Sequence, residues 1–391
     1  MALLHRRLLV VLVALVTGGS AACSDTTGKA ARGDAAASDA GRSGDAGHDA
    51  GLPTCPDPGT AAPTDVFCIG LYVGRDTTRY QAGVLPYTPG VVLWSDGAEK
   101  QRYLQLPPGT QIDTSDMDVW KFPLGTKAFK EFRFDGKLVE TRLLWKQSET
   151  NWIAATYIWN SQDTQAPLNI SRQPTLLETG YEIPTAKDCG RCHHGGADKL
   201  LGVEAVALGL PAAKGITLAS LVAANQLSDP PTKTSIELPE DSSGNAAFAL
   251  GYLHANCGMP CHSSRGLGHA TELLLRLRAD EFWPRSSVQA DAGADAGADA
   301  GADSTFTDVT QTDAYRVTVN QKPTTASVAA KFPDALRITP GSHDKSLLWL
   351  LSHRRGEYQM PPLVSHKVDD VGTQKLADWI DALSSAGAPN P

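Results

Sequence analysis

Alternating hydrophobic and polar residues dominate the chain between about residues 60 and 180. The clearest alternation covers 139–146, and the run 129–134 meets it across Asp135-Gly136, which is typical of a two-residue hairpin turn. Short strands separated by Pro- and Gly-rich turns predict a β-sandwich or a partial barrel. The other candidate strands are 91–94, 102–106, 120–124 and 152–159.

From about residue 181 the pattern changes to short helical segments and loops. Thr217 is expected to cap a helix, and an amphipathic helix is expected near 370–384. The sequence therefore predicts an α+β multidomain chain. A β-sandwich-like domain (53–180) is followed by a mostly α-helical region (181–391).

Two stretches are too polar and too simple in composition to form a core. Residues 23–52 consist mainly of Asp, Ala, Gly and Ser, so we expect a disordered tether. Residues 289–304 repeat Asp, Ala and Gly, which indicates an exposed low-complexity insertion in a loop.

The first residues have the features of an export signal. Arg6 and Arg7 precede an apolar run that is too short to span a bilayer. Small residues then lead to Cys23, in a pattern that resembles the lipobox of bacterial lipoproteins. This resemblance implies that residues 1–22 are removed and that Cys23 is lipidated, with ordinary cleavage after Ala22 as the alternative. We expect a protein of the cell envelope, anchored to a bacterial membrane by lipid only. The outer membrane is favoured, with the protein facing the periplasm or the exterior.

The chain contains seven cysteines. Cys55 and Cys68 lie close together in a Pro- and Gly-rich stretch and are expected to form a disulfide in an oxidising compartment. Four others form two close pairs, each followed at once by a histidine: Cys189 with Cys192, and Cys257 with Cys261.

The first pair belongs to a CxxCH sequence that ends in His193. This spacing suits haem c, because Cys189 and Cys192 can reach the two vinyl groups while His193 binds the iron. A redox CxxC, a zinc half-site and a structural disulfide are the alternatives. No distal iron ligand is evident, because His194 adjoins His193. The candidates are His254, His269, His343, His353 and His366.

The second pair has three residues between its cysteines, so it forms a CxxxCH sequence that ends in His262. Gly258 and Pro260 suit the tight bend that would loop out the extra residue. The alternative is a small disulfide loop. Met360 precedes two prolines and offers a soft thioether ligand for haem iron, although a methionine can also simply fill core space.

A helix, the second cysteine pair, a Met-Pro-Pro loop and a final helix follow one another over about 240–385. This order is similar to a class I cytochrome c domain. The resemblance implies that Cys257 and Cys261 form thioether bonds to haem. It also implies that His262 is the proximal ligand and Met360 the distal one.

Three further motifs resemble a family of secreted bacterial proteins in which a β-rich domain precedes a cytochrome-like region. They are WSDGAEK at 94–100, FPLGT at 122–126 and ETR at 140–142. The charged residues in these motifs are interpreted as surface charges or structural ion pairs rather than as a catalytic site. They are Asp96, Glu99, Glu140 and Arg142.

These patterns together predict an exported c-type cytochrome with two haem c groups. It would transfer electrons between envelope partners such as a dehydrogenase or another cytochrome. One alternative is a haem enzyme, a peroxidase or a small-molecule oxidoreductase, that uses the first haem. Another is a non-haem interaction module with disulfides or zinc. The formal net charge of −8 gives no basis for binding nucleic acid.

Overall fold

The computed structural model describes residues 53–194, 198–283 and 306–384. The described residues belong to one compact unit. The predicted signal (1–22), the tether with Cys23 (23–52) and the low-complexity insertion (289–304) lie outside the described residues.

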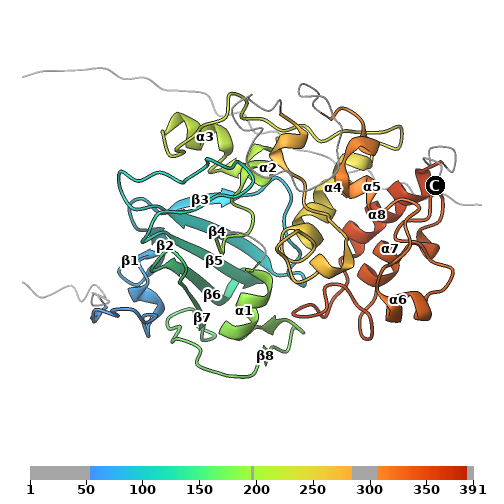
Figure 1. Ribbon diagram of the computed structural model, residues 1–391. Helices are drawn as coiled ribbons and strands as arrows, with labels where there is room; N and C mark the ends of the chain where they lie inside the picture. The colour runs from blue at the N-terminus through green and yellow to red at the C-terminus, as the bar shows by residue number, and fades with distance from the viewer. Residues whose placement is uncertain (1–52, 195–197, 284–305, 385–391) are drawn as a thin grey trace, which may run out of the picture. The chain divides into compact units, whose positions relative to one another are not determined.

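A six-stranded antiparallel sheet is the largest element (Figure 1). Its spatial order is β10-β3-β4-β5-β6-β7, so the edge strand β10 comes from much later in the chain. The predicted hairpin at Asp135-Gly136 is confirmed, and both turn residues have positive φ, as the twist of such a turn requires. The strands are β3 Leu85–Thr88, β4 Glu99–Gln105, β5 Lys127–Phe134, β6 Lys137–Lys146, β7 Trp152–Ile158 and β10 Lys214–Gly215.

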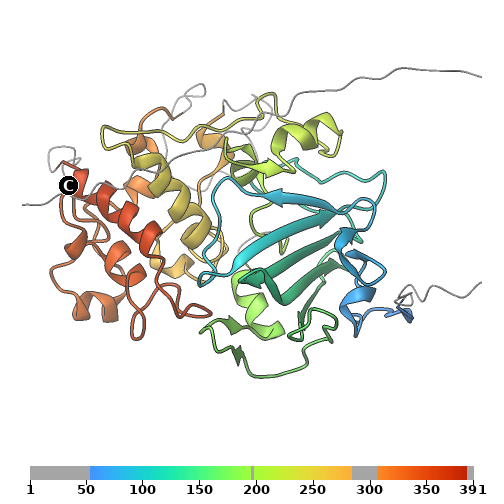
Figure 2. The same cartoon turned by 180° about the vertical axis from the view of Figure 1, so that it is seen from behind.

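Both faces of this sheet are covered, because apolar side chains occupy alternating positions on both sides. On one face, Phe129 packs against the N-terminal segment that contains Ile69 and Leu71. That segment lies beside the sheet in both views (Figures 1 and 2). On the other face, Ala128 packs in a cluster with Leu208, which belongs to a later part of the chain. The second face is the one that positions the cysteine motifs.

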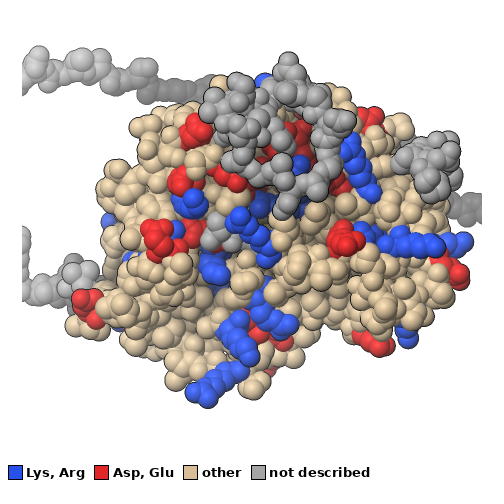
Figure 3. Space-filling model, in the orientation of Figure 1, with Lys and Arg blue, Asp and Glu red and all other residues tan. Residues whose placement is uncertain are grey.

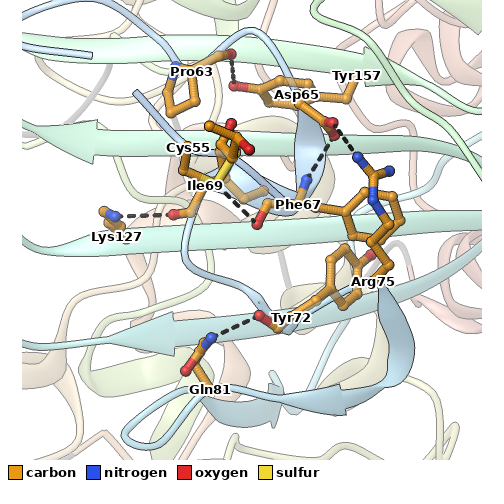
Figure 4. The surroundings of a disulfide bond; sticks show 12 residues. Cys55, Pro63, Asp65, Phe67, Ile69, Tyr72, Arg75, Gln81, Lys127 and Tyr157 are labelled. Atoms are coloured by element: carbon orange, nitrogen blue, oxygen red, sulfur yellow. Dashed lines mark hydrogen bonds and ion pairs between the residues drawn. A yellow bond between two sulfur atoms is a disulfide. The ribbon is translucent and has the colours of Figure 1, made fainter. Parts of the chain in front are cut away.

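The N-terminal segment is held to the sheet near a disulfide between Cys55 and Cys68, as predicted (Figure 4). The Nζ of Lys127 on β5 donates a hydrogen bond to the carbonyl oxygen of Ile69 at 2.9 Å. The hydroxyl of Tyr157 on β7 donates to the carbonyl oxygen of Pro63 at 2.7 Å. Two short strands, β1 Tyr72–Val73 and β2 Asp76–Tyr80, follow.

The remaining elements are short and lie mainly after residue 175. The predicted helix cap is confirmed, because Thr217 caps α3. The predicted helix near 370–384 is also confirmed as α8, which packs against α4 and carries the buried Trp379. The elements are β8 Thr175–Leu176, β9 Glu182–Ile183, α1 Ala186–Cys192, α2 Ala205–Gly209, α3 Leu218–Ala223, α4 Ala246–Leu253, α5 Asp313–Arg316, α6 Ala326–Lys331, α7 Leu347–Ser352 and α8 Asp370–Ala382.

The predicted fold class is wrong in both halves. One large sheet, rather than a β-sandwich, forms the first half, and the second half is not a mostly α-helical, cytochrome c-like region. Among the described helices only α8 exceeds eight residues, because turns and 3₁₀ segments interrupt the chain between α4 and α8. The candidate strands 91–94 and 120–124 do not form either, apart from an isolated bridge at Lys121.

Within the described ranges, no helix combines the length and the apolar character needed to cross a membrane.

Candidate functional site

The first cysteine pair lies on α1, which begins with a capping box. The hydroxyl of Thr185 accepts a hydrogen bond from the backbone N–H of Asp188, whose carboxylate accepts from the N–H of Thr185. This cap places Cys189 and Cys192 three residues apart on one helical face. Both thiols are free and half-buried. A free pair on one face meets the requirement for two bonds to a single planar group.

His193 ends α1, and its ring has a defined tautomer. Its Nδ1 contacts the carbonyl oxygen of Lys199, which can only accept, so Nδ1 carries the proton. The lone pair is therefore on Nε2. Burial, reinforced by the charge of Lys130, lowers the pKa of His193 to about 3, so the ring is neutral at pH 7. A histidine that binds a metal commonly donates its other ring N–H to a carbonyl oxygen in this way.

A buried ion pair fixes the carbonyl that orients His193. Asp198, directly before Lys199, accepts hydrogen bonds from Lys146 Nζ at 2.8 Å and from Trp152 Nε1 at 2.8 Å. The side chains of Lys146 and Asp198 are 2% and 4% exposed. The sheet, through β6 and β7, therefore determines where the segment after the first motif lies.

Directly after α4 the chain forms a π-helical turn, His254–Gly258, which contains Cys257, the first cysteine of the second pair. Backbone N–H groups donate five residues back, from Met259 to His254 at 2.8 Å and from His262 to Cys257 at 2.8 Å. A π turn accommodates one more residue than an α turn, which is how the longer CxxxCH spacing is absorbed. Gly258 is needed for close packing, since a Cβ there would lie 2.5 Å from the backbone of Leu275.

His262 has the same tautomer as His193, set by a different partner. The hydroxyl of Thr271 donates to the carbonyl oxygen of Gly268 at 2.7 Å and is therefore free to accept from His262 Nδ1 at 3.3 Å. The lone pair is again on Nε2. Burial lowers the pKa of His262 to about 4. Gly268 is required here, because a Cβ would lie 2.7 Å from His262 Nδ1.

The two motifs lie near each other. Burial and then the charge of Cys192 raise the pKa of Cys261 to about 11, which places the two thiols within electrostatic range. One pocket is lined by Cys189 and His193, and a second is lined by His254 and Met259. The pockets share two lining residues, Lys130 and Leu201, so they adjoin.

Met360 lies in the loop between α7 and α8. It is half-buried, and its backbone N–H donates to the carbonyl oxygen of Leu351 at 2.7 Å. The same loop is held by Asp96, whose carboxylate accepts from the hydroxyl of Ser365 at 2.9 Å and from the N–H of His366. Asp96 is therefore a buried structural residue rather than a surface charge. The role of Met360 as distal ligand stays a prediction.

His254, one of the candidates for the distal ligand, has both of its ring nitrogens in contact with other groups. Its Nδ1 accepts from the N–H of Leu277 at 3.0 Å, and its Nε2 lies 3.2 Å from Glu204 Oε1. Both ring nitrogens are thus engaged. The other candidates also contact acceptors or hydroxyls through one ring nitrogen: His269 contacts Gly266, His343 contacts Asp381, His353 contacts Thr373 and His366 contacts Glu182.

The charged residues singled out on the strands are part of a larger group that the sequence did not reveal. Glu140 is fully buried and binds Arg142, with 2.9 Å between Oε2 and Nε. Lys130, on β5, lies directly opposite Arg142, on β6. Burial and the neighbouring Arg102 lower the pKa of Lys130 to about 7. The sequence shows one basic residue in each of three strands, Arg102, Lys130 and Arg142. Only the register of the sheet shows that these residues lie opposite one another.

A zinc site receives no support from the described residues, because nowhere among them do three His, Cys, Asp or Glu side chains gather as ligands would. Structural zinc needs four such ligands. By contrast, each motif holds two free thiols and one imidazole with an available Nε2, the donor set that haem c uses. The residues present fit covalently attached haem.

The chain matches no protein-family model, no curated protein and no solved structure.

Proposed function

We propose that this chain is an exported electron carrier with two haem c groups. One is attached through Cys189 and Cys192, and the other through Cys257 and Cys261. The observation that supports this most is shared by both motifs. The Nδ1 of the following histidine contacts a fixed oxygen acceptor, Nε2 has no partner among the described residues, and the two cysteines of the same motif are free thiols.

The protein's own residues would do three things at each site. The thiols hold the group covalently, the Nε2 of His193 or His262 binds the iron, and the acceptors Lys199 and Thr271 keep each ring in one orientation. When bound, haem supplies one-electron redox chemistry. Because burial keeps both imidazoles neutral, ligation does not compete with a proton near pH 7.

The proposed partners are redox proteins of the cell envelope, such as a dehydrogenase or another cytochrome. The formal net charge of −8 favours a basic patch on such a partner and makes association weaker at higher salt. A lipid on Cys23 would keep the carrier at a bacterial membrane, with the outer membrane favoured.

The test is covalent haem content. The full chain is produced with a haem-attachment system, and its peptides are analysed by mass spectrometry together with pyridine haemochrome spectra. We expect two haems in the wild type and one in each double variant, Cys189→Ala/Cys192→Ala and Cys257→Ala/Cys261→Ala. The matched control, Cys55→Ala/Cys68→Ala, should keep two.

The same measurement separates the alternatives. A colourless wild type without adducts on either pair would refute the proposal and favour a disulfide module. A protein that carries haem but turns over peroxide rapidly, with high-spin iron at the first site, would favour the haem enzyme.

A further inference from the structure

Three basic residues lie directly opposite one another on adjacent strands of the sheet. Arg102 on β4 pairs with Lys130 on β5, and Lys130 pairs with Arg142 on β6. Lys100 lies two residues before Arg102 and therefore on the same face. We name these four residues the basic row. Like charges directly opposite each other destabilise a sheet, so this arrangement calls for a counter-charge.

Only one member of the basic row has a carboxylate partner among the described residues. Arg142 binds Glu140, while Lys100 Nζ donates to the carbonyl oxygen of Leu93 at 2.9 Å. Arg102 contacts the carbonyl oxygen of Lys100 at 3.5 Å. Lys130 Nζ has no hydrogen-bond or ion-pair partner in the described part of the chain.

The one carboxylate that shares the second pocket with the row is already engaged. Glu204 caps α2, and its two oxygens accept from the N–H groups of Val206 and Ala207 at 2.7 and 2.6 Å. It also contacts His254. The pocket therefore holds three basic side chains, Lys100, Arg102 and Lys130, while its one carboxylate, Glu204, is already engaged. Burying cations without a partner is costly, so the row suits an anionic ligand.

The row faces the cysteine motifs. Lys130 and Arg142 line the first pocket together with Cys189 and His193, while Lys100 and Arg102 line the pocket that adjoins it. In the space-filling view, Lys and Arg side chains gather down the middle of the face between the sheet and the later helices (Figure 3). A cofactor bound at the first motif would have these cations as neighbours.

We propose that the basic row, centred on Lys130, binds the propionate carboxylates of the haem attached to Cys189 and Cys192. This rests on the proposed function. The two propionate carboxylates are anionic acceptors, and the three side chains without a carboxylate partner are basic donors, so the two sets are complementary in the sign of their charge and in hydrogen-bonding type. The sheet would thus help to set the redox potential, because positive charge beside the haem favours its reduced, less positive form.

The experiment uses the full chain with its haems attached. Lys130→Met removes the central charge, Lys130→Arg keeps it, and Lys137→Met removes an exposed charge from the same hairpin as a matched control. Haem content is measured by mass spectrometry and the potential of each haem by spectroscopic redox titration.

We expect two haems in every variant. In Lys130→Met, the ratio of reduced to oxidised first haem at a fixed ambient potential should fall about tenfold, which is 59 mV for one electron. Lys130→Arg and Lys137→Met should match the wild type. Arg102→Met provides a second variant if Lys130→Met unfolds, and it should shift the same haem.

Two results would overturn the proposal while leaving the proposed function intact. In the first result, Lys130→Met and Arg102→Met both keep two haems with unchanged potentials. In the other, succinate or inorganic phosphate shifts the haem spectrum of the wild type but not of Lys130→Met, so that a free anion occupies the row. A wild type without covalent haem overturns this proposal together with the proposed function.

Discussion

The backbone N–H of Trp94 donates a hydrogen bond to the side-chain oxygen of Asn256 at 2.7 Å, across 162 residues of sequence. Asn256 is buried and directly precedes Cys257. Its amide nitrogen donates to the carbonyl oxygen of Tyr252 at 3.1 Å, within α4. This one side chain joins the loop before β4 to the start of the second cysteine motif.

Replacing Asn256 with Leu should lower the free energy of unfolding by about 1–3 kcal/mol, because the N–H of Trp94 would be buried without a partner. Urea denaturation measures the change. The exposed Asn151→Leu is the control and should stay within about 0.5 kcal/mol of the wild type. Equal effects of the two substitutions would contradict the role given to the Trp94–Asn256 contact.

Breaking the Lys146–Asp198 pair should be much more harmful than breaking an exposed pair. Lys146→Met leaves a buried carboxylate without its cation, which costs about 3–5 kcal/mol. Lys121→Met removes the partner of Asp113 in a pair that is 55% and 43% exposed, and it should cost less than about 1 kcal/mol. Thermal unfolding of both variants checks this difference. Similar losses of stability would show that the buried pair is not special.

Glu281 should contribute less to the stability of the folded protein as the pH rises from about 4.5 to about 8. Burial, followed by the charge of Asp313, raises the pKa of Glu281 to about 8. In that window the folded state holds a proton that the unfolded state has lost. Each pH unit then removes up to about 1.4 kcal/mol of stability.

Glu281→Gln should remove this pH-dependent contribution and raise the stability at pH 8 relative to the wild type, whereas the exposed Glu149→Gln should do neither. The comparison is made by urea unfolding at pH 5, 6.5 and 8. Parallel profiles for the wild type and Glu281→Gln would refute the pKa shift.

Met360→Ala should lower the potential of one haem and allow carbon monoxide to bind its iron, because thioether ligation raises the potential. Met259 is the matched comparison, since it is buried inside the second motif, between Cys257 and Cys261, and lines the second pocket. Met259→Ala should cost about 2–5 kcal/mol of stability through a cavity and leave carbon monoxide binding unchanged. The reverse pattern would contradict the role of Met360 as distal ligand.

Features encoded within a short window could be predicted. The hairpin at Asp135-Gly136 follows from two residues that tolerate positive φ, and the helix Asp370–Ala382 follows from its apolar spacing. The disulfide between Cys55 and Cys68 needed only nearness in sequence. In each case the interacting groups are neighbours in the chain, so local propensity and pattern contain the necessary information.

Features that depend on distant partners could not be predicted. Residues 91–94 have a strand-like composition, yet Trp94 uses its N–H to bind Asn256 instead of a neighbouring strand. The helical cytochrome-like region was expected from an order of motifs. That order does not state how much of the chain between them is helical.

The amino-acid sequence by itself determined which cysteines lie next to which histidines, because in CxxCH and in CxxxCH the histidine directly follows the second cysteine along the chain. Only the tertiary structure decided which ring nitrogen of His193 and His262 is free, since each acceptor lies in a separate turn. It also decided that Arg102, Lys130 and Arg142 form one row. Strand register brings together charges that no local pattern connects.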